Sequence, residues 1–128
     1  NPGEYFSPDG NFSVKVSIIN VKNPEVNIDL TKKEYIKFLD YDRIQDSLIL
    51  RTPEPGDRMV IRSDGAVKKL NRILSDRKIE RTERNKVPVI ACGSEIVWAV
   101  GIRIGENYKV TDNTSRIICL EYKEEKNR

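Results

Sequence analysis

The stretch Leu48–Arg84, LILRTPEPGDRMVIRSDGAVKKLNRILSDRKIERTER, decides how the fold of this chain is interpreted. It passes from a short apolar run through a Pro-Gly-Asp-Arg turn into a lysine pair and an arginine-rich tail. Residues 51–86 contain eleven Lys or Arg and six Asp or Glu, whereas residues 1–50 contain six and eight. The positive charge is therefore concentrated in the middle of the chain, which indicates a polyanionic partner there.

A helix is predicted in the second half of this stretch. Four apolar residues recur at helical spacing and form one stripe: Val67, Leu70, Ile73 and Leu74. This spacing predicts a helix that begins near Asp64-Gly65, with Asp64 capping its first turn. Lys68, Lys69 and Arg72 lie off the stripe, so they form a basic face of the predicted helix.

Outside this helix, most apolar residues follow the patterns of strands. Residues Phe12 to Val21 alternate between apolar and polar, which predicts a half-buried strand. Residues 1–10 hold two prolines and two glycines and are expected to be a loop. The other expected elements are strands at 26–30, 34–39, 48–50, 87–91, 95–100, 108–110 and 116–122, and a short helix at 80–85. The sequence thus predicts a strand-rich α+β fold with one or two helices in the middle.

Length and composition limit the class of protein. The chain has 128 residues, 38% of them hydrophobic and 34% charged, which suits one folded domain spanning 1–128. No apolar run approaches the roughly 20 residues of a membrane helix, and no signal peptide opens the chain. Cys92 and Cys119 lie in apolar segments and are expected to be buried free thiols of a cytoplasmic protein.

The chain contains no histidine. This excludes a Ser-His triad, a Cys-His pair and a His-ligated metal site. Asp40 and Asp42, with Asp46 nearby, are expected to serve a turn rather than to hold a hard cation. The sequence begins at Asn1-Pro2, and we expect it to be a piece of a longer protein.

Six segments between Phe38 and Tyr122 carry a family resemblance. They are FLDYDRI (38–44), LILRTPEPGDR (48–58), KKLNRILSDRKIERTERNKVPVI (68–90), IVWAVGIRI (96–104), YKVTDNT (108–114) and IICLEY (117–122). In this order and spacing the chain resembles the C-terminal domain of bacterial tRNA(Ile)-lysidine synthetases, with 38–122 as the family-like core and 123–128 as a charged tail. It departs from the family pattern at Ile73-Leu74, at Glu80 and in the loop 59–64, so no role is carried over to that loop.

The resemblance implies a layered α+β domain with a β-sandwich, as in a domain of the phenylalanyl-tRNA synthetase β subunit. The family's enzyme uses ATP to attach lysine to the wobble cytidine of an isoleucine tRNA, in a separate N-terminal domain with an SGGxDS-type loop. This chain holds no such loop, so no catalytic residue, cofactor or metal is expected in it, and ATP and Mg belong to that other domain. The implied partners are the tRNA(Ile) acceptor stem, the N-terminal catalytic domain and a second copy in a homodimer, with no membrane.

The implied RNA-binding residues are all basic. They are Lys68, Lys69, Arg72, Arg58, Arg51, Arg81, Arg84 and Arg103. Structural roles compete with RNA contact at several of these positions: Arg58 has an ion pair with Asp57 or Asp76 as its alternative, and Arg51 lies beside the same turn. Arg81 and Arg84 have Glu80 and Glu83 as neighbours, and Arg103 alternates with apolar residues.

Trp98 and the chain as a whole each have a structural interpretation beside the functional one. Trp98 is expected to be a core residue rather than a stacking platform for a base. The whole chain could instead be a structural domain that packs on the catalytic domain or on a second subunit, which would expose an apolar patch on the isolated chain.

Overall fold

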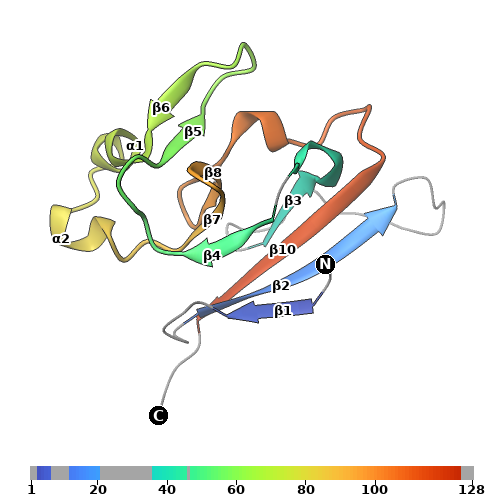
Figure 1. Cartoon of the computed structure of the whole chain (residues 1–128), viewed down its shortest axis with the longest axis horizontal. Helices are drawn as coiled ribbons and strands as arrows, with labels where there is room; N and C mark the ends of the chain where they lie inside the picture. Colours follow the sequence, from blue (N-terminus) through green and yellow to red (C-terminus); the bar gives the residue numbers. More distant parts are fainter. Residues whose placement is uncertain (1–2, 7–11, 21–35, 46, 125–128) are drawn as a thin grey trace. The chain divides into compact units, whose positions relative to one another are not determined.

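The computed structural model describes residues 3–6, 12–20, 36–45 and 47–124 (Figure 1). The chain divides into two compact units, one formed by Asn1–Gln45 with Tyr108–Arg128 and the other by Asp46–Asn107. The second unit is thus inserted between two parts of the first. That residues 1–128 form one domain stays a prediction.

The first unit contains a four-stranded antiparallel sheet in the order β1-β2-β10-β3. Its strands are β1 (Gly3–Phe6), β2 (Phe12–Asn20), β3 (Ile36–Asp40) and β10 (Arg116–Glu124), and the 3-10 turn η1 (Tyr41–Arg43) follows β3. The predicted strand is confirmed, with Phe12, Val14 and Val16 buried and Lys15 exposed, but Ser13, which the alternation placed on the exposed face, is buried as well. β2 and β10 run side by side along their whole nine residues (Figure 1).

The structure differs from two of the predictions for this unit. The loop expected at 1–10 was wrong for residues 3–6, because β1 pairs with β2 through contacts that a local pattern does not show. The strand expected at 108–110 was also wrong: the 3-10 turn η2 (Glu106–Tyr108) occupies this place, and Lys109 forms only an isolated bridge with Leu39. The strand expected at 26–30 lies outside the described residues.

The second unit contains the other sheet, in the order β4-β7-β8-β5-β6, with β9 paired to β8. Its strands are β4 (Ile49–Arg51), β5 (Arg58–Val60), β6 (Val67–Lys69), β7 (Val89–Cys92), β8 (Glu95–Ala99) and β9 (Arg103–Ile104). The β5–β8 pair is parallel and the other pairs are antiparallel. The strands predicted at 48–50, 87–91 and 95–100 are confirmed to within two residues, as is the short helix α2 (Arg81–Arg84).

The core of this unit is built where α1 (Leu70–Asp76) joins the sheet. Its buried members are Met59, Leu70, Ile73, Leu74, Val89, Ala91, Ile96 and Ala99. Trp98 on β8 has no exposed surface, which confirms its core role. Cys92 and Cys119 form no disulfide in the described part of the chain, and both are half-buried rather than buried as expected.

The predicted start of the helix was wrong. The helix begins at Leu70, and Lys68 and Lys69 lie on β6, with Lys69 as the N-cap residue of α1. Asp64 caps no helix: its carboxylate accepts a hydrogen bond from the Ala66 amide (3.0 Å) in the turn between β5 and β6. Val67 is 54% exposed, so it does not belong to the buried stripe of α1. The predicted α+β, strand-rich class is nevertheless confirmed.

Candidate nucleic-acid interface

The hairpin formed by β5 and β6 presents basic side chains on one face. Its register pairs Arg58 with Lys69, Met59 with Lys68, and Val60 with Val67. Side chains alternate between the two faces of a strand, so Met59 is fully buried while Arg58 and Lys69 are exposed.

The Arg58–Lys69 pair places two positive charges directly opposite each other. Like charges at such positions destabilise a sheet. Neither side chain forms an ion pair within the part of the chain that the structure describes. Glu95 on β8 is the neighbour of Arg58 on the other side; its carboxylate accepts a hydrogen bond from the Asn107 side chain (3.1 Å) and forms no ion pair with Arg58 among the described residues. A bound anion would relieve the repulsion between Arg58 and Lys69.

The helix α1, which follows β6 directly in the chain, carries a third exposed cation. The Leu70 amide donates to the Asp57 carbonyl (2.9 Å), which fixes where the helix leaves the hairpin. Leu70, Ile73 and Leu74 are buried in the core, so Arg72 on the other side of α1 is exposed.

Lys68 differs from its neighbours because it forms an ion pair with Asp76, the last residue of α1. The hydrogen bond from Lys68, followed by the charges of Lys68 and Arg72, lowers the pKa of Asp76 below its ordinary value, against the effect of desolvation. Sequence reasoning named Asp76 as an alternative partner of Arg58 and did not pair it with Lys68. The position of Asp76 four residues after Arg72 on a helix was a local signal that it lies near the basic residues of α1.

Arg51 is a structural residue of the turn. Its guanidinium donates to both carboxylate oxygens of Asp57 (2.8 and 2.9 Å) and to the carbonyls of Thr52 (2.9 Å) and Gly93 (3.1 Å). Asp57 also accepts from the Glu54 amide (2.8 Å). The hydrogen bonds to Asp57 raise the pKa of Arg51 against the effect of desolvation, and the side chain is only 10% exposed. We therefore leave Arg51 out of the contact surface, and Asp57 is not a partner of Arg58.

Arg84 and Arg103 also have structural partners, whereas Arg81 is exposed. Arg84 donates to the Ile79 carbonyl (2.9 Å). Arg103 is half-buried, donates to the carbonyls of Ile61 and Ile104 (3.3 Å each), and lies 3.5 Å from a Glu106 carboxylate oxygen. The structure thus pairs Arg58 and Lys69 across the hairpin as exposed cations and leaves Arg72 exposed on the helix that follows β6, whereas Arg51, Arg84 and Arg103 hold loops.

The two glycine turns do not fit the phosphates of ATP. Gly56 and Gly93 adopt positive φ angles of 89° and 63°, which favour glycine. Each turn leads into a strand, β5 or β8, and not into the helix N-terminus that a phosphate loop supplies. No step of ATP chemistry is assigned to these residues.

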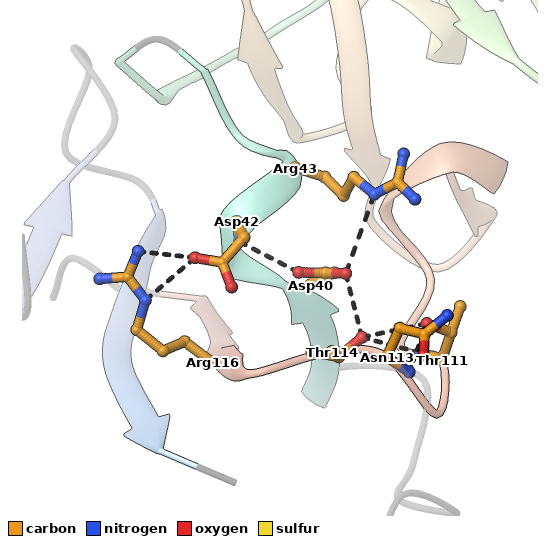
Figure 2. Close-up of polar contacts among 7 residues, drawn as sticks. All are labelled: Asp40, Asp42, Arg43, Thr111, Asn113, Thr114 and Arg116. Atoms are coloured by element: carbon orange, nitrogen blue, oxygen red, sulfur yellow. Dashed lines mark hydrogen bonds and ion pairs between the residues drawn. The ribbon is translucent and has the colours of Figure 1, made fainter. Parts of the chain in front are cut away.

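A second polar cluster joins the two segments of the first unit (Figure 2). The buried Asp40 carboxylate accepts hydrogen bonds from the Asp42 amide and the Thr114 hydroxyl (3.0 Å each) and lies 3.9 Å from the Arg43 guanidinium. Arg116 donates to Asp42 (2.6 and 3.0 Å) and lies over the Tyr41 ring. The carboxylates of Asp40 and Asp42 thus have protein partners, and within the described residues no group of three metal-ligating side chains occurs.

The described helices are also too short and too polar to cross a membrane.

Known proteins with similar sequences define the family. Residues 48–120 match the model of the TilS substrate C-terminal domain. A tRNA(Ile)-lysidine synthase of Caldanaerobacter subterraneus subsp. tengcongensis is 44% identical over 97 residues, which cover 76% of this chain and 21% of that protein. One from Clostridium tetani is 34% identical over 119 residues, which cover 92% of this chain and 25% of that protein.

A solved structure, described as the crystal structure of TILS C-terminal domain, is similar over 98% of this chain and 93% of that chain, with a TM-score of 0.72 and 24% identity. The chain therefore has the same strand-rich α+β fold as that C-terminal domain. It belongs to the family of TilS substrate C-terminal domains. It spans only a fifth to a quarter of the length of these two relatives.

Proposed function

We propose that this chain binds the acceptor stem of an isoleucine tRNA, while a separate N-terminal domain of the parent protein attaches lysine to the wobble cytidine. Two relatives are named tRNA(Ile)-lysidine synthases, which supports a tRNA partner. ATP and Mg would act in that other domain, in the cytoplasm where tRNA is modified. The single observation that carries the proposal is the exposed, like-charged pair of Arg58 and Lys69.

The chemistry of an RNA stem suits this pair. An acceptor stem is an A-form duplex, and its deep major groove resists reading by side chains, so recognition uses phosphates, 2′-hydroxyls and shape. Cations that already repel each other gain from a phosphate placed between them. Arg72 is exposed on α1, the helix that follows β6, and would add a further phosphate contact there.

A salt titration with matched variants tests the proposal. The logarithm of the affinity for an acceptor-stem hairpin should fall linearly with the logarithm of salt concentration. Arg58→Ala/Lys69→Ala should weaken binding on the order of tenfold and reduce the slope by about two, one for each lost phosphate contact. The control is Arg62→Ala/Lys86→Ala, which removes two exposed cations that are paired with Asp64 and Glu83.

Two outcomes would reject this assignment. If the control variant loses as much affinity as Arg58→Ala/Lys69→Ala, only net charge matters and the hairpin is not the site. If the chain binds the single strands of the stem as tightly as the duplex, the acceptor-stem assignment fails even where the hairpin residues matter.

A structural role is the alternative, and exposed aromatic residues favour it. Tyr5 and Phe6 on β1 are 42% and 57% exposed. Under this alternative, β1 packs on the catalytic domain or on a second copy of the chain. Phe6→Ser would then weaken that association, measured by sedimentation with and without the catalytic domain, and would leave RNA affinity unchanged.

A further inference from the structure

Glu95 lies in the same cross-strand row as the two cations of the hairpin. β5 lies between β6 and β8, and its register pairs Arg58 with Lys69 on one side and with Glu95 on the other. Residues that pair across neighbouring strands point to the same face of a sheet. The next residues along β5 and β8, Met59 and Ile96, are fully buried in the core, so the row lies on the opposite face. This face therefore presents two positive side chains and one negative side chain in a line.

The Glu95 carboxylate is held in this row without neutralising either cation. One of its oxygens accepts a hydrogen bond from the Asn107 side chain (3.1 Å), which belongs to the 3-10 turn η2. Among the described residues its other oxygen accepts no hydrogen bond, and no ion pair joins Glu95 to Arg58 or Lys69. The contact between Asn107 and Glu95 is exposed, so a ligand reaches this carboxylate. The row thus combines an oriented hydrogen-bond acceptor with two cations.

We infer that Glu95 is a specificity-determining residue that distinguishes RNA from DNA, by accepting a hydrogen bond from a ribose 2′-hydroxyl next to the phosphates bound by Arg58 and Lys69. This inference rests on the proposed function and adds a role within the same surface. The 2′-hydroxyl is a donor that DNA lacks, and an A-form stem displays it in the minor groove. Neighbouring strands are about 4.8 Å apart, which is the scale on which phosphates and 2′-hydroxyls alternate along a ribose-phosphate backbone.

The negative charge of Glu95 makes the discrimination stronger than a neutral acceptor would. In a DNA duplex the carboxylate meets a phosphate backbone without a donor for it, so it repels the ligand. In an RNA duplex the hydrogen bond from the 2′-hydroxyl to this charged acceptor offsets the repulsion. Asn107 is a positioning residue, because its amide holds one carboxylate oxygen and leaves the other available.

RNA and DNA duplexes with the sequence of the acceptor stem test the inference. At one salt concentration, the wild-type chain should bind the RNA duplex on the order of tenfold more tightly, because DNA lacks a hydrogen bond to a charged group. Glu95→Ala should tighten DNA binding and weaken RNA binding by about threefold each, so that the ratio approaches one. The matched control is Asp64→Asn, which neutralises an exposed carboxylate paired with Arg62 in the hairpin turn and should leave the ratio unchanged.

Single 2′-deoxy substitutions along the RNA stem separate this contact from duplex shape. At the position next to the hairpin, one substitution should weaken wild-type binding about five- to tenfold, and Glu95→Ala should lose less than about twofold there. Asn107→Ala keeps the carboxylate but not its orientation, so its loss should lie between these two. Glu95→Gln keeps an acceptor for Asn107 and should lower the ratio of RNA to DNA affinity about threefold, which provides a second variant if Glu95→Ala impairs folding.

The outcomes separate this inference from the proposed function. If Glu95→Ala and Glu95→Gln respond to every 2′-deoxy substitution as wild type does, the role of Glu95 is rejected. Equal binding of RNA and DNA duplexes by wild type also rejects it. In both cases the proposed function stands if Arg58→Ala/Lys69→Ala still weakens binding to the stem. If wild type binds neither duplex at low salt, both are rejected. A loss of 2′-deoxy sensitivity in the Glu95 variants but not in Asp64→Asn supports the inference.

Discussion

Asp57 is the residue that holds the turn before the basic hairpin. Its carboxylate binds the buried guanidinium of Arg51 through two hydrogen bonds and accepts a third from the Glu54 amide. Asp57→Ala leaves a buried cation without its partner, so we expect the free energy of unfolding to fall by about 3–5 kcal/mol. Denaturant unfolding followed by circular dichroism measures this loss.

An exposed ion pair provides the comparison. Lys86→Ala removes the partner of Glu83, and both side chains are more than half exposed, so the expected loss is below about 1 kcal/mol. Equal losses in Asp57→Ala and Lys86→Ala would contradict the burial that the structure gives to the Arg51–Asp57 pair.

At the scale of an element, the two cations that face each other across the hairpin β5–β6 lower its stability, and the same two cations attract an anion. Lys69→Glu places opposite charges across the strands from Arg58, so we expect a gain of about 0.2–1 kcal/mol in the free energy of unfolding. The same variant should bind the RNA stem more weakly than wild type. Thermal unfolding and the RNA titration, performed on one preparation, measure both effects.

Lys69→Gln separates the two contributions, because it removes the repulsion without adding an attraction. Its stability should lie between those of wild type and Lys69→Glu, and the differences should shrink at high salt. If Lys69→Glu were less stable than wild type at low salt, the cross-strand repulsion would not be the dominant interaction of this pair.

The same hairpin shows how far the sequence predicted the structure. Leu70, Ile73 and Leu74 were recognised correctly as a buried stripe, because helical spacing is a local property. Val67 fitted the same spacing by coincidence, and its place on β6 depends on pairing with Val60, seven residues earlier. The Asp64-Gly65 pair is the local sequence signal of a turn there, and Gly65 adopts a positive φ (91°) in it.

The candidate site was predicted in composition but not in geometry. Residue type and charge concentration selected Arg58, Lys69 and Arg72 among other basic residues. They could not separate these from Arg51 and Arg103, because burial against Asp57 and Ile61 depends on contacts between distant segments. β1 was missed for the same reason, since its partner β2 supplies the pattern that its own four residues lack.

At the scale of the whole molecule, the chain leaves the first unit after Gln45 and returns to it at Tyr108. The cluster around Asp40 lies beside both crossing points, because it joins the end of β3 to the segment that leads into β10 (Figure 2). The contacts from Asp40 to Thr114 and from Asp42 to Arg116 each span 74 residues. The cluster therefore closes the first unit by joining its two chain segments.

Thr114→Val tests whether this closure acts on the first unit alone. The variant removes a hydroxyl donor from the buried Asp40 carboxylate and an acceptor from the Thr111 amide, so we expect a loss of about 1–3 kcal/mol. Hydrogen exchange should then show weaker protection in β3 and β10, with β7 and β8 changed less. Thr114→Ser keeps the hydroxyl and should retain most of the protection. Equal loss of protection in all four strands would instead show that the two units unfold together, as one domain spanning residues 1–128 would.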